Sequence, residues 1–277
     1  MTYPLPLTRR ATVGGHEIAW DCWGSDDDES LVLCHGFSGS ACDFDHLVSD
    51  LVALGLRVVL LEQRGHGRSD RTSTYSLDEL ADDLCTVLPQ VSDRPPTLLG
   101  HSLGGRVSMA AAAKHPELLR SLVLMDTSAW SFRHPDPDLA ALLEAFITGF
   151  DPDGGLPSTL PEGPEEDLVA AAGDPEHLAA RRAMQRRFDP QALKQLGLEL
   201  FGTGHGFRDR LDLLTMPVTV IVGSEDEPFA SQAAELAQLA GGDLAVIDGA
   251  FHSPQLTHAK EWLAAVDGHL RSLDTLT

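Results

Sequence analysis

The stretch that decides the fold is Leu98-Leu99-Gly100-His101-Ser102-Leu103-Gly104-Gly105, which places a Gly-x-Ser-x-Gly pattern at the end of an apolar run. A helical pattern follows directly. A serine on a sharp strand-to-helix turn has a strained backbone, so the residues two positions away must be small. Such a turn lifts the hydroxyl above the sheet and points the N-terminus of the next helix at a developing oxyanion. The pattern therefore predicts a nucleophile at Ser102.

Short apolar runs alternate with longer helical patterns on both sides of this stretch. The apolar runs are Leu31–Cys34, Val58–Leu61, Thr97–Leu99, Leu122–Met125, Val218–Val222 and Leu244–Ile247. The helical patterns lie near Phe44–Leu54, Leu77–Leu88, Val107–Lys114, Ser231–Leu239 and Ala259–Leu270. Near-continuous apolar runs are typical of strands buried on both faces of a mostly parallel sheet. The alternation predicts a three-layer α/β fold with right-handed crossovers.

Two regions depart from this alternation. Arg9–Gly14 and His16–Cys22, joined around Gly14-Gly15, predict an N-terminal antiparallel hairpin at the sheet edge. From residue 128 to residue 213 no buried strand is recognisable, and the pattern is helical. We expect residues 1–127 and 214–277 to form the two parts of one core and residues 128–213 to form a helical cap, or lid, inserted between them. A peripheral helical decoration is the alternative.

The composition limits the partners. A net charge of −22 argues against nucleic acid and against an anionic membrane surface, because both attract cationic proteins. The cysteines (Cys22, Cys34, Cys42 and Cys85) show no zinc-site spacing and are expected to be free thiols. We recognise no secretory signal or membrane span, so a cytoplasmic protein acting on a small molecule is expected, without cofactor or metal. The sequence leaves the oligomeric state open.

Four further motifs strengthen the interpretation of Ser102. They are Leu33-Cys34-His35-Gly36-Phe37, the run from Glu62 to Asp70 (EQRGHGRSD), Val222-Gly223-Ser224-Glu225-Asp226 and Gly249-Ala250-Phe251-His252. With the serine motif, and in this order, they resemble the α/β-hydrolase superfamily over nearly the whole chain except the helical insertion. Glu62 stands where that family usually has Asp, at a structural position.

The resemblance implies a catalytic triad. Ser102 would be the nucleophile, His252 the general base and Asp226 the acid that orients the imidazole. The order Ser, Asp, His along the chain is the one this architecture uses. The alternatives to these assignments are His258 for the base, and Glu225, Glu227 and, above all, Asp126 for the acid.

The resemblance also implies an oxyanion hole formed by the backbone N–H groups of Phe37 and Leu103. His35 and His101 are expected to be structural. Arg106, one helical turn after Ser102, could bind a substrate carboxylate, as in the menaquinone-pathway lyases that this segment also resembles, or form a structural salt bridge.

Other substrate contacts are less defined. Trp130 and Phe132 could line an acyl pocket or belong to the core. Arg181, Arg182, Arg186 and Arg187 form a basic cluster, which we expect to be a solvated face paired with acids rather than a site for an anion.

These residues predict a serine hydrolase that cleaves an ester, lactone or thioester of a small organic acid through an acyl-serine intermediate. One alternative keeps the triad for C–C bond hydrolysis or a menaquinone-type lyase reaction. Another is a ligand-binding protein that keeps the fold without turnover. Haloalkane dehalogenases and epoxide hydrolases share the fold but use a carboxylate nucleophile, so Ser102 argues against them.

Overall fold

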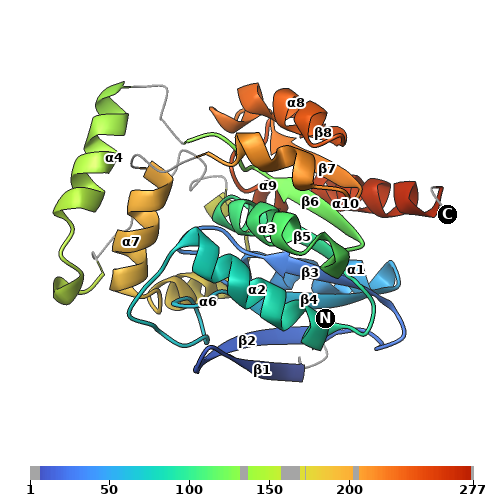
Figure 1. Ribbon diagram of the computed structural model, residues 1–277, viewed down its shortest axis with the longest axis horizontal. Coiled ribbons are helices and arrows are strands. Elements are labelled where there is room, and N and C mark those ends of the chain that lie inside the picture. The colour runs from blue at the N-terminus through green and yellow to red at the C-terminus, as the bar shows by residue number, and fades with distance from the viewer. Residues whose placement is uncertain (1–6, 132–136, 157–168, 172, 202–205, 276–277) are drawn as a thin grey trace.

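A single mixed sheet organises the protein (Figure 1). The computed structural model describes residues 7–131, 137–156, 169–171, 173–201 and 206–275. Within these ranges the strand order in the sheet is β1-β2-β4-β3-β5-β6-β7-β8. The strands are β1 (Leu7–Val13), β2 (His16–Trp23), β3 (Glu29–Cys34), β4 (Leu56–Glu62), β5 (Thr97–His101), β6 (Ser121–Met125), β7 (Val218–Gly223) and β8 (Asp243–Ile247).

The first two strands form the antiparallel hairpin that the sequence predicts. Val13 pairs with His16 around Gly14 and Gly15, which have φ values of 57° and 97°. Strand β2 also runs antiparallel to β4, whereas the pairs from β4 through β3 to β8 are parallel. The mostly parallel sheet with an antiparallel start is confirmed.

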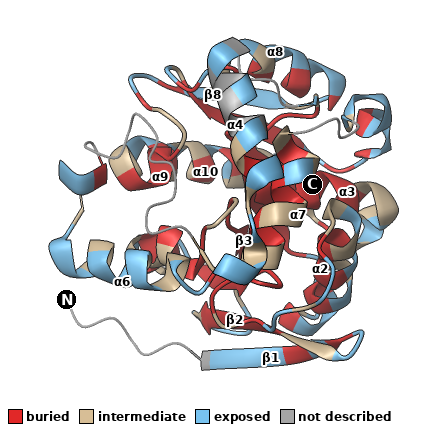
Figure 2. Cartoon of the chain, turned by 90° about the vertical axis from the view of Figure 1, so that its left-hand side faces the viewer, coloured by how far each residue is buried: buried red, intermediate tan, exposed pale blue. Residues whose placement is uncertain are grey.

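The sheet is buried on both faces because successive side chains of a strand point to opposite sides. In β3, Val32 and Cys34 join one core and Leu31 and Leu33 join the other. Helices α2 (Leu77–Val91), α3 (Leu103–Lys114) and α8 (Phe229–Leu239) cover the first face, and α1 (Val48–Ala53) and α10 (Ala259–Asp274) cover the second. Figure 2 shows the burial concentrated in the strands and in the inward sides of these helices.

Helices occupy the described part of the chain between β6 and β7. They are α4 (Pro137–Gly149), η4 (Pro152–Gly154), α6 (Pro175–Gln185), α7 (Pro190–Phe201) and η5 (Arg208–Leu213). Helices α4 and α7 lie beside the sheet, at the left of Figure 1. They pack closely, since a Cβ atom on Gly197 would lie 2.7 Å from the side chain of Ile147. This agrees with a helical insertion, whose limits at residues 128 and 213 stay a prediction.

Hydrogen bonds fasten α7 to the loop that precedes α2. The Tyr75 hydroxyl donates to Asp189 Oδ2 at 2.5 Å, and the Asp189 amide donates to the Gly65 carbonyl at 2.8 Å. The amides of Tyr75 and Leu77 donate to the Gln195 and Glu199 side chains at 2.8 and 2.7 Å.

The last strand corrects one expectation. The sequence predicts that Leu244–Ile247 is buried on both faces, but Leu244 and Val246 are 40% and 56% exposed. Strand β8 is last in the sheet order, and only the face carrying Ala245 and Ile247 packs against a core.

Two helices also differ from their predicted limits. The pattern at Phe44–Leu54 is divided between the short turn η2 (Asp45–Leu47) and α1, and it follows another short turn, η1 (Ala41–Asp43). Helix α3 begins at Leu103, earlier than the predicted Val107, because Ser102 already acts as its N-cap residue. The remaining short helices are η3 (Pro116–Leu118) and α9 (Pro254–Thr257).

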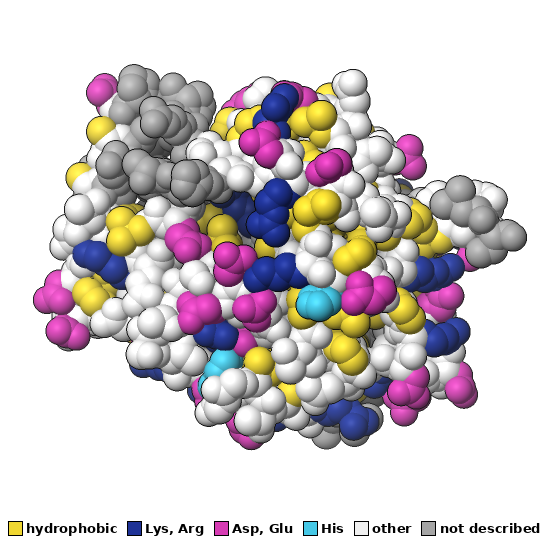
Figure 3. All heavy atoms as spheres, in the orientation of Figure 1, with side chains coloured by type: hydrophobic (Ala, Val, Ile, Leu, Met, Phe, Trp, Pro, Cys, Tyr) yellow, Lys and Arg dark blue, Asp and Glu magenta, His cyan; other side chains and the backbone are white. Residues whose placement is uncertain are grey.

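The surface reflects the composition. Acidic side chains are spread over the face seen in Figure 3, with basic ones between them. The four cysteines are free thiols, as expected. None of the helices in the described ranges combines the length and apolar character that crossing a bilayer requires.

The contrast between β7 and β8 gives a test with a built-in control. Val222 and Val246 are register partners, but Val222 is 2% exposed and Val246 is 56% exposed. We expect Val222→Ala to lower the free energy of unfolding by about 2 kcal/mol, because it leaves a cavity in the core. Val246→Ala should change it by less than about 0.5 kcal/mol. Urea denaturation measures both, and equal losses would contradict the assignment of β8 as half exposed.

Candidate active site

Ser102 occupies the turn between β5 and α3. Its backbone angles are φ 52° and ψ −114°, a region that residues other than glycine rarely adopt and that costs about 1–3 kcal/mol. The Ser102 amide donates to the Met125 carbonyl at 2.9 Å, and Thr127 Oγ1 donates to the Ser102 carbonyl at 2.7 Å. The predicted strand-turn-helix context of the serine is therefore present.

Close packing explains the two glycines of the motif. A Cβ atom on Gly100 would lie 2.5 Å from Ser108 Oγ and would also clash with the Gly104 carbonyl. A Cβ atom on Gly104 would lie 2.5 Å from the His35 carbonyl oxygen. Since backbone atoms cannot move away easily, both positions require glycine for contact rather than for flexibility.

The loops after β7 and β8 bring an imidazole and a carboxylate together. His252 Nδ1 lies 2.9 Å from Asp226 Oδ2. The Asp226 side chain is 8% exposed and that of His252 33%, so the carboxylate is buried and the imidazole reaches solvent. Glu225 and Glu227, the flanking alternatives for the acid, are exposed.

His101 connects this pair to the serine turn. Its Nε2 lies 2.7 Å from the His252 carbonyl oxygen, and the two rings are 4.9 Å apart. Burial lowers the pKa of His101 to about 3, so the ring is neutral and its Nε2–H donates to that carbonyl. Because Ser102 follows His101 directly, the His252 loop is fastened beside the turn that carries the hydroxyl.

The remaining alternatives have other surroundings. Asp126 is fully buried at φ 44°, and its Oδ1 accepts a hydrogen bond from the Gly223 amide at 2.9 Å. It thus joins the ends of β6 and β7, just before the loop that carries Asp226. His258, expected on a solvated helix face, is half-buried at the N-cap of α10, with Nδ1 2.9 Å from Thr257 Oγ1.

Two backbone amides flank Ser102. Leu103 is the first residue of α3, where an N–H group has no intrahelical partner. A Cβ atom on Gly36 would lie 3.2 Å from Ser102 Cβ, so the chain that continues into Phe37 passes directly beside the serine. The Phe37 ring packs edge-on against Phe188 and Phe201, at 5.4 and 5.9 Å between ring centroids. Sequence reasoning did not identify these two aromatic contacts.

His35 is buried and hydrogen-bonded on both ring nitrogens. The backbone N–H of Gln63 donates to His35 Nε2 at 3.2 Å, and His35 Nδ1 lies 2.9 Å from the Gly36 carbonyl oxygen. An Nε2 that accepts requires the proton on Nδ1, which then donates to Gly36. These bonds hold the turn that presents Phe37.

Arg106 and Trp130 contact each other through the backbone. Arg106 is buried, and its guanidinium donates to the Trp130 carbonyl. Burial lowers the pKa of Arg106 to about 10. Trp130 is half-buried and packs against the core beside α3. Phe132 lies outside the described residues.

In the arginine cluster, Arg182, Arg186 and Arg187 are exposed and Arg181 is half-buried. Arg181 Nε donates to buried Asp43 at 2.7 Å, and Arg187 Nε donates to the Gly67 carbonyl at 2.9 Å. Two members of the cluster therefore bind core loops, which the sequence pattern did not predict.

Comparisons with known proteins agree with this architecture. Residues 29–259 match the family model described as the alpha/beta hydrolase fold. The chain is 31% identical over 256 residues to a monoacylglycerol lipase from Mycolicibacterium smegmatis, covering 87% of this chain and 88% of that protein.

Solved structures extend the similarity of fold. A carboxylesterase structure from Nitrososphaera gargenis has a TM-score of 0.76 at 23% identity, covering 97% of this chain and 100% of that one. The enol-lactonase from Burkholderia xenovorans LB400 has a TM-score of 0.76 at 22% identity, covering 95% and 100%.

The environment of His101 predicts a specific pH dependence. In the unfolded chain this histidine gains a proton as the pH falls through about 6.5, but in the folded protein it does so only near pH 3. Between these values the unfolded state binds the extra proton, so His101 lowers stability as the medium becomes more acidic. An NMR titration should show the His101 ring, identified by its absence in His101→Asn, still neutral at about pH 4.5. Titration near pH 6.5 would contradict its burial.

Proposed function

The chain belongs to the α/β-hydrolase fold family, and on that premise we propose that it is a serine hydrolase that cleaves a carboxylic ester, lactone or thioester. The observation that carries this proposal is the 2.9 Å contact between His252 Nδ1 and Asp226 Oδ2, in a loop bonded to His101 next to Ser102. A base held by a buried carboxylate beside a strained serine is the arrangement that nucleophilic catalysis requires.

The acylation step uses these three side chains. A serine hydroxyl is a weak nucleophile near neutral pH. With Nδ1 of His252 engaged by Asp226, Nε2 accepts the Ser102 proton as the oxygen attacks the carbonyl carbon. The Asp226 carboxylate keeps the imidazole in the tautomer that can accept, and then stabilises the imidazolium that forms.

Charge on the substrate oxygen is stabilised by the backbone. The amides of Leu103 and Phe37 would donate to the oxyanion of the tetrahedral intermediate, and the N-terminus of α3 adds its partial positive charge. When the intermediate collapses, the imidazolium of His252 protonates the leaving alkoxide. Water then attacks the acyl-serine, with His252 again as the base.

The surroundings of Phe37 favour an apolar acyl group. Phe37 contacts Phe188 and Phe201, from the segment that we propose as the cap, residues 128–213. An aromatic group of this kind next to the proposed oxyanion hole would exclude water from the acyl chain. The relative named as a monoacylglycerol lipase supports an ester with an apolar acyl chain.

The competing functions receive less support. A lyase would need Arg106 to bind a substrate carboxylate, but this guanidinium is buried and already donates to the Trp130 carbonyl. A protein that only binds a ligand would not require a buried carboxylate such as Asp226 in contact with the imidazole of His252. We therefore propose ester-type hydrolysis ahead of C–C bond cleavage or non-catalytic binding.

Labelling with a fluorophosphonate probe tests the nucleophile. The probe phosphonylates a serine that an adjacent base activates, so the wild-type protein should become labelled. Ser102→Ala should not, and Ser108→Ala is the matched control, because Ser108 lies in the helix that follows Ser102 but is fully buried. An unlabelled wild-type protein would favour the binding function.

Kinetics on a short p-nitrophenyl ester test the acid. We expect Ser102→Ala to lower kcat on the order of 10⁶-fold and Asp226→Asn on the order of 10⁴-fold, since the nucleophile and base remain in the second variant. Asp126→Ala should act mainly on stability, because it removes the acceptor of the Gly223 amide. If Asp226→Asn matched the wild type, the acid would have to be reassigned to Asp126.

A further inference from the structure

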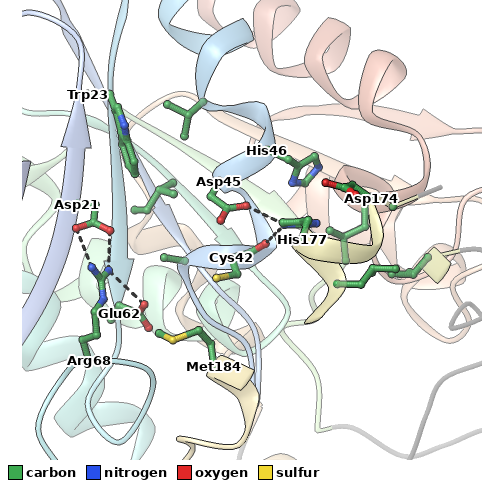
Figure 4. A pocket seen from close by; sticks show the side chains of 17 residues that line it. Asp21, Trp23, Cys42, Asp45, His46, Glu62, Arg68, Asp174, His177 and Met184 are labelled. Carbon is green, nitrogen blue, oxygen red and sulfur yellow. Dashed lines mark hydrogen bonds and ion pairs between the residues drawn. The ribbon is translucent and has the colours of Figure 1, made fainter. Parts of the chain in front are cut away.

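A cavity lies away from the proposed triad, where α6 meets the loop after β3. Its volume is about 650 Å³, and Ser102, Asp226 and His252 do not line it. Figure 4 shows that the side chains around it come both from the core, such as Trp23 and Cys42, and from α6, such as His177.

Three potential metal ligands gather at one side of this cavity. Asp45 and His46 come from η2 and His177 from α6, and one donor atom of each lies within 4.8 Å of the other two. All three residues are half-buried. His177 is far from Asp45 and His46 in the sequence, and only the fold brings the three together. Motif spacing in the sequence therefore gave no sign of a metal site.

The His46 ring is oriented by the backbone. Its Nε2 lies 2.9 Å from the Gln255 carbonyl oxygen. In the neutral ring, an Nε2 that donates to this carbonyl carries the proton and leaves a lone pair on Nδ1. A histidine whose outer N–H donates to a backbone carbonyl is the usual arrangement of a metal ligand.

Two oxygen atoms converge on one nitrogen of His177. Nε2 lies 2.8 Å from Asp45 Oδ1 and 2.9 Å from the Cys42 carbonyl oxygen (Figure 4). A carboxylate oxygen and a carbonyl oxygen both face this nitrogen, so this position attracts positive charge. Asp45 Oδ1 is buried and faces the imidazole of His177, so a cation at this place would meet a carboxylate oxygen and a ring nitrogen together.

We propose that Asp45, His46 and His177 bind a divalent transition-metal ion, with Zn²⁺ the best fit. Two imidazoles and one carboxylate are typical zinc ligands, whereas Mg²⁺ and Ca²⁺ prefer oxygen alone. Ligand atoms about 2.0–2.2 Å from a tetrahedral zinc ion lie about 3.3 Å from one another. The donor atoms here lie within 4.8 Å of one another, so a pair at that limit would have to come closer by about 1.5 Å. The Cys42 carbonyl or a water molecule of the cavity completes the site.

The ion binds imidazole nitrogens that carry no proton, so protons compete with it and affinity falls as the pH is lowered. Because His177 belongs to α6 and the other two ligands to η2, the bound ion links the helical segment to the core. It adds to the ion pair that Arg181 already makes with Asp43, one helical turn away.

Isothermal titration of the EDTA-treated full-length protein with ZnCl₂ tests this site. We expect one Zn²⁺ per chain, and His46→Gln and His177→Gln should each weaken binding by more than about 100-fold. His115→Gln is the matched control, since His115 also sits beside an acid, Glu117, but on the surface. His252→Ala should bind zinc like the wild type, which separates this site from the proposed triad.

Two further measurements keep the test informative if one variant folds poorly. Co²⁺ should give the visible absorption of a tetrahedral site in the wild type and lose it in Asp45→Asn. Zinc should raise the melting temperature of the wild type in a concentration-dependent way, but not that of His177→Gln. The proposal is overturned if the wild type binds no zinc, if binding survives His177→Gln, or if it disappears in His252→Ala.

Discussion

The strained backbone of Ser102 is the constraint on which the rest of the site depends. At φ 52° the serine can be held only if its neighbours define its position from several sides. The Met125 carbonyl and the Thr127 hydroxyl do so by hydrogen bonds, and Gly100 and Gly104 do so by allowing direct contact of backbones. The strain is sustained because β5, which leads into the turn, and β6 beside it are buried along their whole length.

Residues next to this turn also hold the loops that surround it. His101 holds the backbone of His252, and Asp126 holds the amide of Gly223, three residues before Asp226. Both supports are buried side chains whose hydrogen bonds water cannot replace easily. The imidazole-carboxylate pair is thus fixed by the ends of β5 and β6, although its own residues follow β7 and β8.

Much of this arrangement could be predicted from local patterns. The apolar runs located six strands, and the Gly-x-Ser-x-Gly spacing located the serine turn, because steric limits act within a few residues there. Exposure of β8 was not predicted, since the pattern of Leu244–Ile247 is the same whether or not a helix covers both faces. The contacts of Arg181 and His177 with Asp43 and Asp45 join distant segments, and single-sequence patterns carry no signal for such pairs.

The bonds between α7 and the loop before α2 restrict how far α7 can move relative to the core. Swinging α7 outward would break the Tyr75–Asp189 bond and strip two backbone amides, those of Tyr75 and Leu77, of their side-chain acceptors. Each broken bond of this kind costs about 1–3 kcal/mol when the groups stay buried. Helix α7 is therefore held in a fixed position, and with it Phe201, whose ring packs against Phe37 in the loop beside Ser102.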